Sequence, residues 1–405
     1  MTDVQSEREL SPAQRLLLGV LVLALLALSA WGVYITLTGV NSILIWDFHP
    51  PWTALHAMLR EGSDPYSPEV LSTIQEQMLG RPALPGEDQC AFAYPLYIIV
   101  LIGPLVYLPL PVAQAIWLAV ILASLFVFAL LAPRAVGWHP PSWLLVLTLF
   151  FALGLNSTVW AIWLGQVSIV VAAFTALAWW GMRTSRWALA GVCLALSTIK
   201  PQMVFLFVPA VLLWASCRRQ WRLVIAFAIA LAALILIPML WLPNWPLIWL
   251  NAMRHYAGYS IYEPPLMMLF SSAWLAAGLA ALLLAWIAYR WRWAEQRAVA
   301  SFDWALSMLL VATALIAPRT SYVNQLVLLL PLFFVFGQAS RPGVIIAVGL
   351  ALLIGPWSLD ILLSPPLNSP EYLVWKHQVI NPIFPMGLTL ALLALSPRVA
   401  RGNRR

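Results

Sequence analysis

Long apolar stretches recur along nearly the whole chain, and this feature constrains the possible fold more than any other. Several reach the about 18 residues or more that an α-helix needs to cross a bilayer. Hydrophobic residues make up 62% of the 405 residues and charged residues 9%, whereas a soluble domain carries about 25% charged residues. Because a segment in lipid must satisfy its backbone hydrogen bonds internally, we expect an all-α polytopic membrane protein.

The first apolar run, 16–38, follows Arg8 and Arg15 and is too long for the apolar core of a signal peptide. We therefore interpret it as an uncleaved first membrane helix. Further apolar segments are expected at 95–110, 112–132, 142–164, 166–182, 187–199, 201–216, 222–242, 266–290, 301–317, 323–337, 343–361 and 383–396.

The lysine and arginine residues predict the orientation. They occur singly or in small groups between apolar segments, which argues against nucleic-acid binding in spite of the net charge of +7. With the N-terminus on the cytoplasmic side of the plasma membrane, 16 of the 22 basic residues lie inside, as the positive-inside rule requires. This orientation places the loops 39–94, 243–265 and 362–382 on the extracytoplasmic side.

The number of crossings is expected to be about 12, in a single domain that covers 1–405. Thirteen full crossings would leave the C-terminus outside, so one segment must fail to cross. Either 95–110, which is short and rich in proline, is re-entrant, or 187–216 is one helix bent at Lys200-Pro201. The first alternative is preferred because it keeps Arg183 and Arg186 on the inside.

The first large polar loop, 41–94, holds most of the chemistry that carboxylates could perform. Seven of the 15 acidic residues lie in it, and none occurs between Asp88 and Glu263. The loop also predicts two short amphipathic helices that lie in the membrane interface. The first would start near Pro51 and stop at Gly62, and the second would start at the N-cap Ser67 and end at Gly80.

Asp47 is the candidate catalytic residue. It follows the apolar residues 43–46 directly, so we expect it at the membrane rim, where a carboxylate is partly desolvated and can act as a base towards a hydroxyl group. The alternative is an ordinary solvated acid at the interface. His49, two residues further on, is an additional candidate for substrate binding.

Two basic residues and one amide are further candidates. Lys200, one of only two lysines, interrupts an apolar stretch, where its ammonium can neutralise a phosphate or simply extend to the interface. Arg319 lies in a polar break on the outer face, and a guanidinium suits phosphate contacts. Gln166 is a polar group between apolar segments, for which a hydrogen bond between helices is the other interpretation.

Asp64-Pro65-Tyr66 can contact a ligand, although the tripeptide is also an ordinary turn former. Tyr94, Tyr322 and Asn324 complete the expected substrate-binding residues. The five His and three Cys form no cluster with the spacing of metal ligands, so we expect no metal site and no cofactor.

At this point the chain resembles a known family, the polyprenol-phosphate-mannose-dependent α-mannosyltransferases, which have the C-type membrane glycosyltransferase (GT-C) fold. The motifs follow one another in order and spacing over about 45–335, which is most of the chain. The matching stretches are Asp47-Phe48, Gly62-x-Asp64-Pro65-Tyr66, Phe92-x-Tyr94-Pro95-Leu96, Trp117, Gly165-Gln166-Val167, Arg186 to Gly191, Lys200-Pro201, and Ala317-Pro318 through Pro331.

The resemblance implies transfer of a hexose, with mannose the first choice, from a polyprenyl-phosphate donor to a glycolipid or glycan acceptor, among membrane lipids and outside the cytoplasm. A first-loop aspartate is the usual general base in this family, and Asp47 matches it, while Lys200 matches the family lysine. The chain departs from the family pattern at Val323-Asn324-Gln325, where many relatives carry an acid or a His pair, and at Leu96, where relatives carry a second proline.

Two other function classes remain open. A transporter or lipid flippase would place ionisable residues near mid-membrane on paired broken helices and would show repeat symmetry. This chain concentrates its carboxylates in one loop, which favours the enzyme. An inactive scaffold would keep the fold and lose the base; Asp47 argues against it and Asn324 argues weakly for it.

Overall fold

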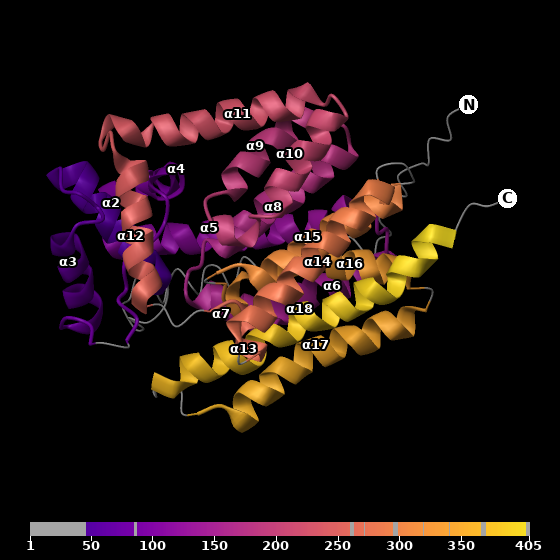
Figure 1. The fold of residues 1–405 in the computed structure, drawn as a ribbon. Coiled ribbons are helices and arrows are strands. Elements are labelled where there is room, and N and C mark those ends of the chain that lie inside the picture. The colour runs from indigo at the N-terminus through magenta and orange to yellow at the C-terminus, as the bar shows by residue number, and fades with distance from the viewer. Residues whose placement is uncertain are drawn as a thin grey trace.

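The computed structural model describes residues 46–84, 87–259, 263–270, 272–294, 299–318, 320–339, 341–365 and 370–401. Every regular element in these ranges is a helix, which agrees with the expected all-α class. Figure 1 shows the chain as an elongated bundle, with the helices of the first loop gathered at one end. The expected first membrane helix, 16–38, lies outside the described residues.

The first loop folds into the two short helices that its cap residues predicted. η1 (Trp46–Phe48) leads into α2 (His49–Glu61), and α3 (Pro68–Leu79) follows. Gly62 ends α2 with φ +72° and Gly80 ends α3 with φ +68°, the left-handed conformation that glycine adopts most easily. Ser67 Oγ accepts a hydrogen bond from the Val70 amide at 3.3 Å and so caps α3.

The segment after the loop is broken where its prolines occur. η2 (Leu96–Ile98), α4 (Ile99–Ile102) and η3 (Gly103–Tyr107) are all short, and Pro109 then precedes the long α5 (Leu110–Ala135). The region expected at 142–164 is also broken, into α6 (Ser142–Gly154) and α7 (Asn156–Trp163), which meet at 55°.

Four helices form the next part of the bundle: α8 (Ser168–Arg183), α9 (Trp187–Ser197), α10 (Phe207–Cys217) and α11 (Trp221–Leu236). α9 packs closely between α8 and α11. A Cβ atom on Gly191 of α9 would overlap the carbonyl oxygen of Leu223 on α11, so the close approach of these helices requires glycine at this position. The loop between α9 and α10 contains η4 (Pro201–Met203).

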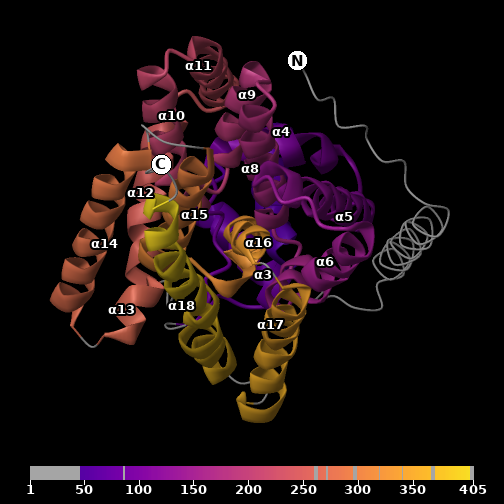
Figure 2. The same cartoon turned by 90° about the vertical axis from the view of Figure 1, so that its right-hand side faces the viewer.

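The second half of the chain begins with η5 (Pro238–Leu240), α12 (Trp245–Tyr259), α13 (Pro265–Leu269), α14 (Ala273–Ala294) and α15 (Val299–Ile316). η6 (Tyr322–Leu328) is buried along its whole length, and most residues of α16 (Leu329–Gln338) are buried as well. α16 contacts α5, α15 and α18, and Figure 2 shows it near the middle of the bundle.

The last two helices, α17 (Pro342–Leu363) and α18 (Pro370–Arg401), lie side by side. α18 differs from the sequence prediction, because it includes residues 370–382, which are most of the loop expected at 362–382. The polar residues that made 370–382 look like a loop include Lys376, which is fully buried and paired with Asp360 of α17. A charge neutralised in this way can lie within an apolar helix.

The described part of the chain contains five helices long and apolar enough to cross a membrane, or six if the bent pair α6–α7 is one crossing. They are 110–135, 221–240, 273–291, 342–363 and 374–395. Several shorter apolar helices, among them α8, α9, α10 and α15, lie between them. The structure thus supports a multi-pass helical protein, and the expected total of about 12 crossings remains a prediction.

A partly buried ion pair fixes three of these helices at the end away from the first loop. Arg183 of α8 contacts Asp303 of α15 at 2.5 Å, and its Nε donates to the Ala135 carbonyl of α5 at 2.7 Å. The indole Nε1 of Trp179 donates to the other oxygen of Asp303 at 3.0 Å. These contacts hold α8 in position, and α8 begins beside the candidate site.

Candidate active site

Asp47 is held at the junction between the first loop and the bundle. Its backbone N–H donates to the carbonyl of Leu164 at 2.8 Å. The next residue, Phe48, is buried and stacks on Trp117 of α5, with ring centroids 5.5 Å apart. The indole Nε1 of Trp117 donates in turn to the Gly165 carbonyl at 2.8 Å. Leu164 thus accepts a hydrogen bond from Asp47, and Gly165 accepts one from Trp117. Gln166 is the next residue in the chain.

The turn between α7 and α8 brings Gln166 towards Asp47. Gly165 has φ +71°, a left-handed conformation that is strained for other residues. The backbone N–H of Gln166 then donates to the Ala161 carbonyl at 2.8 Å and closes the turn. Substitution at Gly165 would therefore disturb the position of Gln166 directly.

Gln166 joins Asp47 to Lys200. Its Nε2 donates to Asp47 Oδ2, and its Oε1 accepts from the Lys200 ammonium at 2.5 Å. The amide is oriented as the charges require, with its N–H side towards the carboxylate and its oxygen towards the ammonium. Gln166 is 8% and Lys200 6% exposed, so both polar groups lie inside the protein. We call Asp47, Gln166 and Lys200 the amide bridge.

Lys200 occupies the break between α9 and η4. The following Pro201 disfavours helical geometry at Lys200, which has φ −124° and ψ 78°. The Tyr97 hydroxyl donates to the Thr198 carbonyl at 2.9 Å and ties this break to the segment after the first loop. The break is thus a defined structure, held from a segment about 100 residues earlier in the chain.

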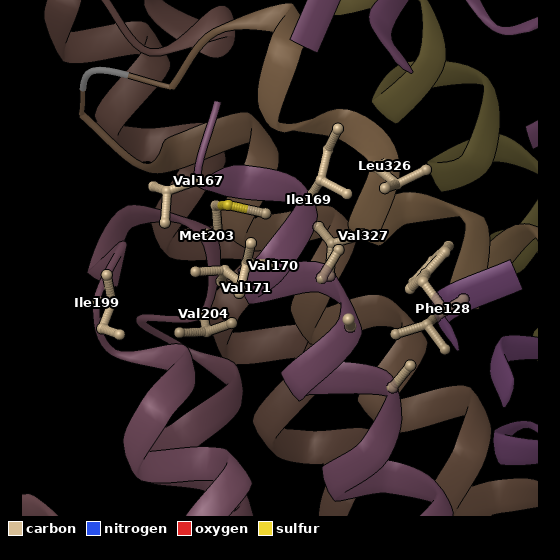
Figure 3. Close-up of a cluster of buried hydrophobic side chains, with 14 of the residues drawn as sticks. Phe128, Val167, Ile169, Val170, Val171, Ile199, Met203, Val204, Leu326 and Val327 are labelled. Atoms are coloured by element: carbon tan, nitrogen blue, oxygen red, sulfur yellow. The ribbon is translucent and has the colours of Figure 1, made fainter. Parts of the chain in front are cut away.

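Buried apolar residues flank two members of the amide bridge in the sequence. Figure 3 shows Val167, Ile169, Ile199 and Met203 in a buried apolar cluster together with Val327 of η6. Val167 directly follows Gln166, and Ile199 directly precedes Lys200. Because Gln166 and Lys200 are themselves buried, charge interactions at the bridge are stronger than in solvent.

The environment raises the pKa of Asp47 to about 7, from a usual value near 3.8. Burial is the largest cause, and the negative charge of Asp88 adds to it. The charge of Lys200 and the hydrogen bond from Gln166 act in the opposite direction. A carboxylate with a pKa near neutrality is suited to accept and release a proton at physiological pH.

Two of the expected residues from η6 lie near this centre. Tyr322 and Asn324 are buried, and η6 is held to the start of α8 by the Ser168 hydroxyl, which donates to the Val323 carbonyl at 2.8 Å. The ring centroid of Tyr322 lies 4.9 Å from the Lys376 ammonium of α18. Arg319, which the sequence places just before η6, lies outside the described residues.

The other expected residues lie in two separate groups within the first loop. Asp64 accepts from the Tyr66 amide at 2.9 Å, and the Tyr66 hydroxyl donates to the Tyr94 carbonyl at 2.7 Å. His49 Nε2 lies 2.9 Å from Gln77 Oε1 of α3, and burial lowers its pKa. These contacts maintain the loop, and none of those described joins them to the amide bridge. Their roles in substrate binding remain predictions.

The structure adds a charged cluster that sequence reasoning missed. Lys376 Nζ lies 2.6 Å from Asp360 Oδ2 and 3.1 Å from the Tyr372 hydroxyl, which itself donates to Asp360 Oδ1 at 2.9 Å. Asn156 Nδ2 donates to Asp360 Oδ2 at 2.9 Å. The ammonium also lies 3.9 Å from the ring centroid of Trp160 and 4.9 Å from that of Tyr322.

A signal for this cluster was present in the sequence. Asp360 is a carboxylate inside an apolar run, and Lys376 is the second of only two lysines. Ionisable residues at such positions mark functional or paired sites. The two residues meet because α17 and α18 pack antiparallel. The sequence predicted a loop at 362–382 and therefore did not predict this packing.

In the described ranges no group of three or more His, Cys, Asp or Glu side chains is arranged to hold a metal ion.

The comparisons with known proteins give one family. The model for glycosyltransferase family 87 matches residues 92–318, which is more than half of the chain, so the protein belongs to this family. No curated protein and no solved structure matches the chain. The matched region contains Gln166 and Lys200, whereas Asp47, Asp360 and Lys376 lie outside it. The protein is thus a membrane glycosyltransferase, which implies a sugar donor and an acceptor, and the transporter alternative is not favoured.

Proposed function

We propose that this family 87 glycosyltransferase moves a hexose, with mannose the first candidate, from a polyprenyl-phosphate donor to a hydroxyl group of a glycolipid or glycan. The observation that carries the proposal is the amide bridge, which sets a base and a cation at opposite ends of one glutamine. A sugar transfer from a phosphate-linked donor requires these two groups: one removes the proton of the acceptor, and the other stabilises the departing phosphate.

Asp47 is the general base of the proposed reaction. It removes the proton of the acceptor hydroxyl while the hydroxyl oxygen attacks the anomeric carbon of the donor sugar. Attack opposite the leaving group inverts the configuration at that carbon. The hydrogen bond from Gln166 to Asp47 Oδ2 orients the carboxylate, so that Oδ1 can face the acceptor.

Lys200 stabilises the leaving group. When the bond between the anomeric carbon and the phosphate oxygen breaks, the polyprenyl phosphate becomes a phosphate monoester and gains one negative charge. A buried ammonium nearby stabilises this charge because few water molecules screen it. Arg319 is proposed as a second phosphate contact from its position in the sequence.

The proposed location is the extracytoplasmic side of the plasma membrane, with the N-terminus in the cytoplasm. The excess of basic residues in the loops assigned to the cytoplasm supports this orientation. α2 and α3 then lie at the outer surface, and Trp249 of α12 donates to the Ala93 carbonyl at 3.2 Å, which places α12 against the end of the same loop. These elements exclude water, which otherwise competes as an acceptor.

The donor is tested with the purified protein in detergent or lipid nanodiscs. We expect transfer of labelled mannose from a polyprenyl-phosphate-mannose to membrane glycolipids, and no transfer from a nucleotide-linked mannose. The configuration at the new bond, measured by NMR, should be opposite to that in the donor. Transfer from the nucleotide sugar alone, or retained configuration, would refute the donor or the mechanism respectively.

The pKa of Asp47 predicts the pH dependence of this reaction. The base acts only when deprotonated, so kcat/KM should rise with pH and level off above about 7. Because the charge of Asp88 raises the pKa of Asp47, Asp88→Asn should move the rise to lower pH. Asparagine can keep the bond that Asp88 Oδ1 accepts from the Cys90 amide at 2.9 Å, so the loop should keep its conformation.

Glu87→Gln is the matched control for this profile. Glu87 is the adjacent acid, but it pairs with the exposed Arg81 at 2.8 Å and does not act on Asp47. Its profile should coincide with that of the wild type. An unchanged profile in Asp88→Asn, or an equal displacement in both variants, would contradict the assignment of the titration to Asp47.

A further inference from the structure

Buried polar atoms without a hydrogen-bond partner are concentrated at one interface of the described structure. They are Asn156 Oδ1, Thr158 Oγ1, Trp160 Nε1, Ser307 Oγ and Asn324 Oδ1. Three of the five lie on α7 and one on η6, and these two elements pack against each other. Native proteins leave only a few buried polar groups unpaired, so their concentration at one contact requires a specific explanation.

Asn156 and Trp160 have the clearest geometry. They lie four residues apart on α7, so their side chains share one face of the helix. The other functional group of each residue is already engaged: Asn156 Nδ2 donates to Asp360, and the ring of Trp160 faces the Lys376 ammonium. The surrounding contacts thus fix both side chains, and leave one acceptor and one donor unused on the same face.

The pair of unused groups distinguishes between possible ligands. A phosphate offers only acceptors, so it could pair with the indole N–H but not with the Asn156 oxygen. The adjacent ammonium is already neutralised by Asp360 at 2.6 Å, so the cluster carries no excess positive charge for an anion. A hydroxyl group donates one hydrogen bond and accepts others, and therefore complements both atoms.

The cluster is also connected to the proposed reaction centre. The ring centroid of Tyr322, on η6, is 4.9 Å from Lys376 Nζ, and the next residue of η6, Val323, accepts a hydrogen bond from Ser168, two residues after Gln166.

We propose that the facing sides of α7 and η6 form a hexose-binding subsite, in which Trp160 Nε1 donates to, and Asn156 Oδ1 accepts from, a sugar hydroxyl. The subsite rests on the proposed function for its connection to Asp47. The hexose belongs either to the donor or to the acceptor, and the same hydroxyl chemistry serves both.

The test uses Trp160→Phe, which removes the indole N–H but keeps an aromatic ring beside Lys376. Trp163→Phe is the matched control, because Trp163 is on the same helix and 40% exposed. Transfer is measured with a short-chain prenyl-phosphate-mannose and a soluble mannoside acceptor, and then with the monodeoxy analogues of each. One deoxy analogue should lower the kcat/KM of the wild type by about 2- to 10-fold, the effect of one hydrogen bond.

With the parent sugar, the kcat/KM of Trp160→Phe should be about 2- to 10-fold below that of the wild type. The deoxy analogue that impairs the wild type should not lower the kcat/KM of Trp160→Phe any further. Trp163→Phe should behave as the wild type with both sugars. Whether the sensitive analogue is a donor or an acceptor identifies the source of the hexose. If Trp160→Phe keeps the full penalty for every analogue of both series, the unpaired atoms serve water or structure, and the subsite is refuted.

A binding measurement separates this inference from the proposed function. The thermal stability of the detergent-solubilised protein is followed with methyl α-mannoside, which needs no turnover and no prenyl donor. Stabilisation of Trp160→Phe that requires about 2- to 10-fold more methyl α-mannoside than that of the wild type supports the subsite even if the prenyl-phosphate donor proves wrong. Equal stabilisation of both proteins, or of neither, refutes the subsite, while transfer by the wild type would still support the proposed function.

Discussion

Asp47→Asn is expected to lower the rate of sugar transfer by about 10²- to 10⁴-fold, the usual contribution of a general base. Asparagine has nearly the same size as aspartate and still offers an oxygen to Gln166 Nε2, so the amide bridge can form. It cannot take up a proton from the acceptor hydroxyl. The loss should therefore appear in kcat, with the affinity for the donor little changed.

The comparison requires equal amounts of folded protein. Glu76→Gln is the matched control, since Glu76 is an exposed acid of α3 in the same loop, and its variant should transfer sugar at the wild-type rate. The melting temperature of each purified variant reports folding. Transfer that survives in Asp47→Asn would assign the base to another residue of the first loop, with Asp64 the next candidate.

Asp360→Ala is expected to lower the free energy of unfolding by about 3–5 kcal/mol, because it leaves the ammonium of Lys376 buried without its carboxylate. Lys376 is 0% and Asp360 6% exposed, so water cannot replace the lost partner without a structural change. Tyr372 and Asn156 lose their hydrogen-bond acceptor in the same variant. The measurement is denaturant unfolding in detergent, followed by tryptophan fluorescence.

The double variant Asp360→Leu, Lys376→Met tests the physical reason. If the cost arises from an uncompensated charge, removing both charges should restore most of the lost stability. Glu87→Ala is the control for ion pairs in general: it breaks the exposed Arg81–Glu87 pair and should have little or no effect on stability. A double variant as unstable as Asp360→Ala would show that the packing of these side chains, rather than charge, holds α17 to α18.

The helices of the first loop could be predicted from the sequence to within about two residues, because their boundaries depend on local chemistry. A proline in the first turn, a serine N-cap and a glycine at each C-terminus are sufficient to start and stop α2 and α3. The apolar segments predicted the long helices for the same reason, since their lengths and compositions are local properties.

The predicted helix boundaries were wrong where an ion pair between distant residues outweighed the local amino-acid composition. Lys376 and the polar residues around it predicted a loop, but the chain forms the first turns of α18 there. Asp360, 16 residues earlier, neutralises the lysine, and no local sequence pattern identifies Asp360 as its partner.

The candidate site shows the same division. Asp47, Gln166 and Lys200 were each recognisable as polar residues next to apolar segments, and each had an ordinary alternative interpretation. Only the folded chain places Gln166 between the other two, which are separated from it by 119 and 34 residues. The sequence by itself determined the helical class, the helices of the first loop and the individual candidates, because these depend on neighbouring residues. The tertiary structure alone decided which candidates meet and which charges are neutralised, because those contacts depend on how distant helices pack.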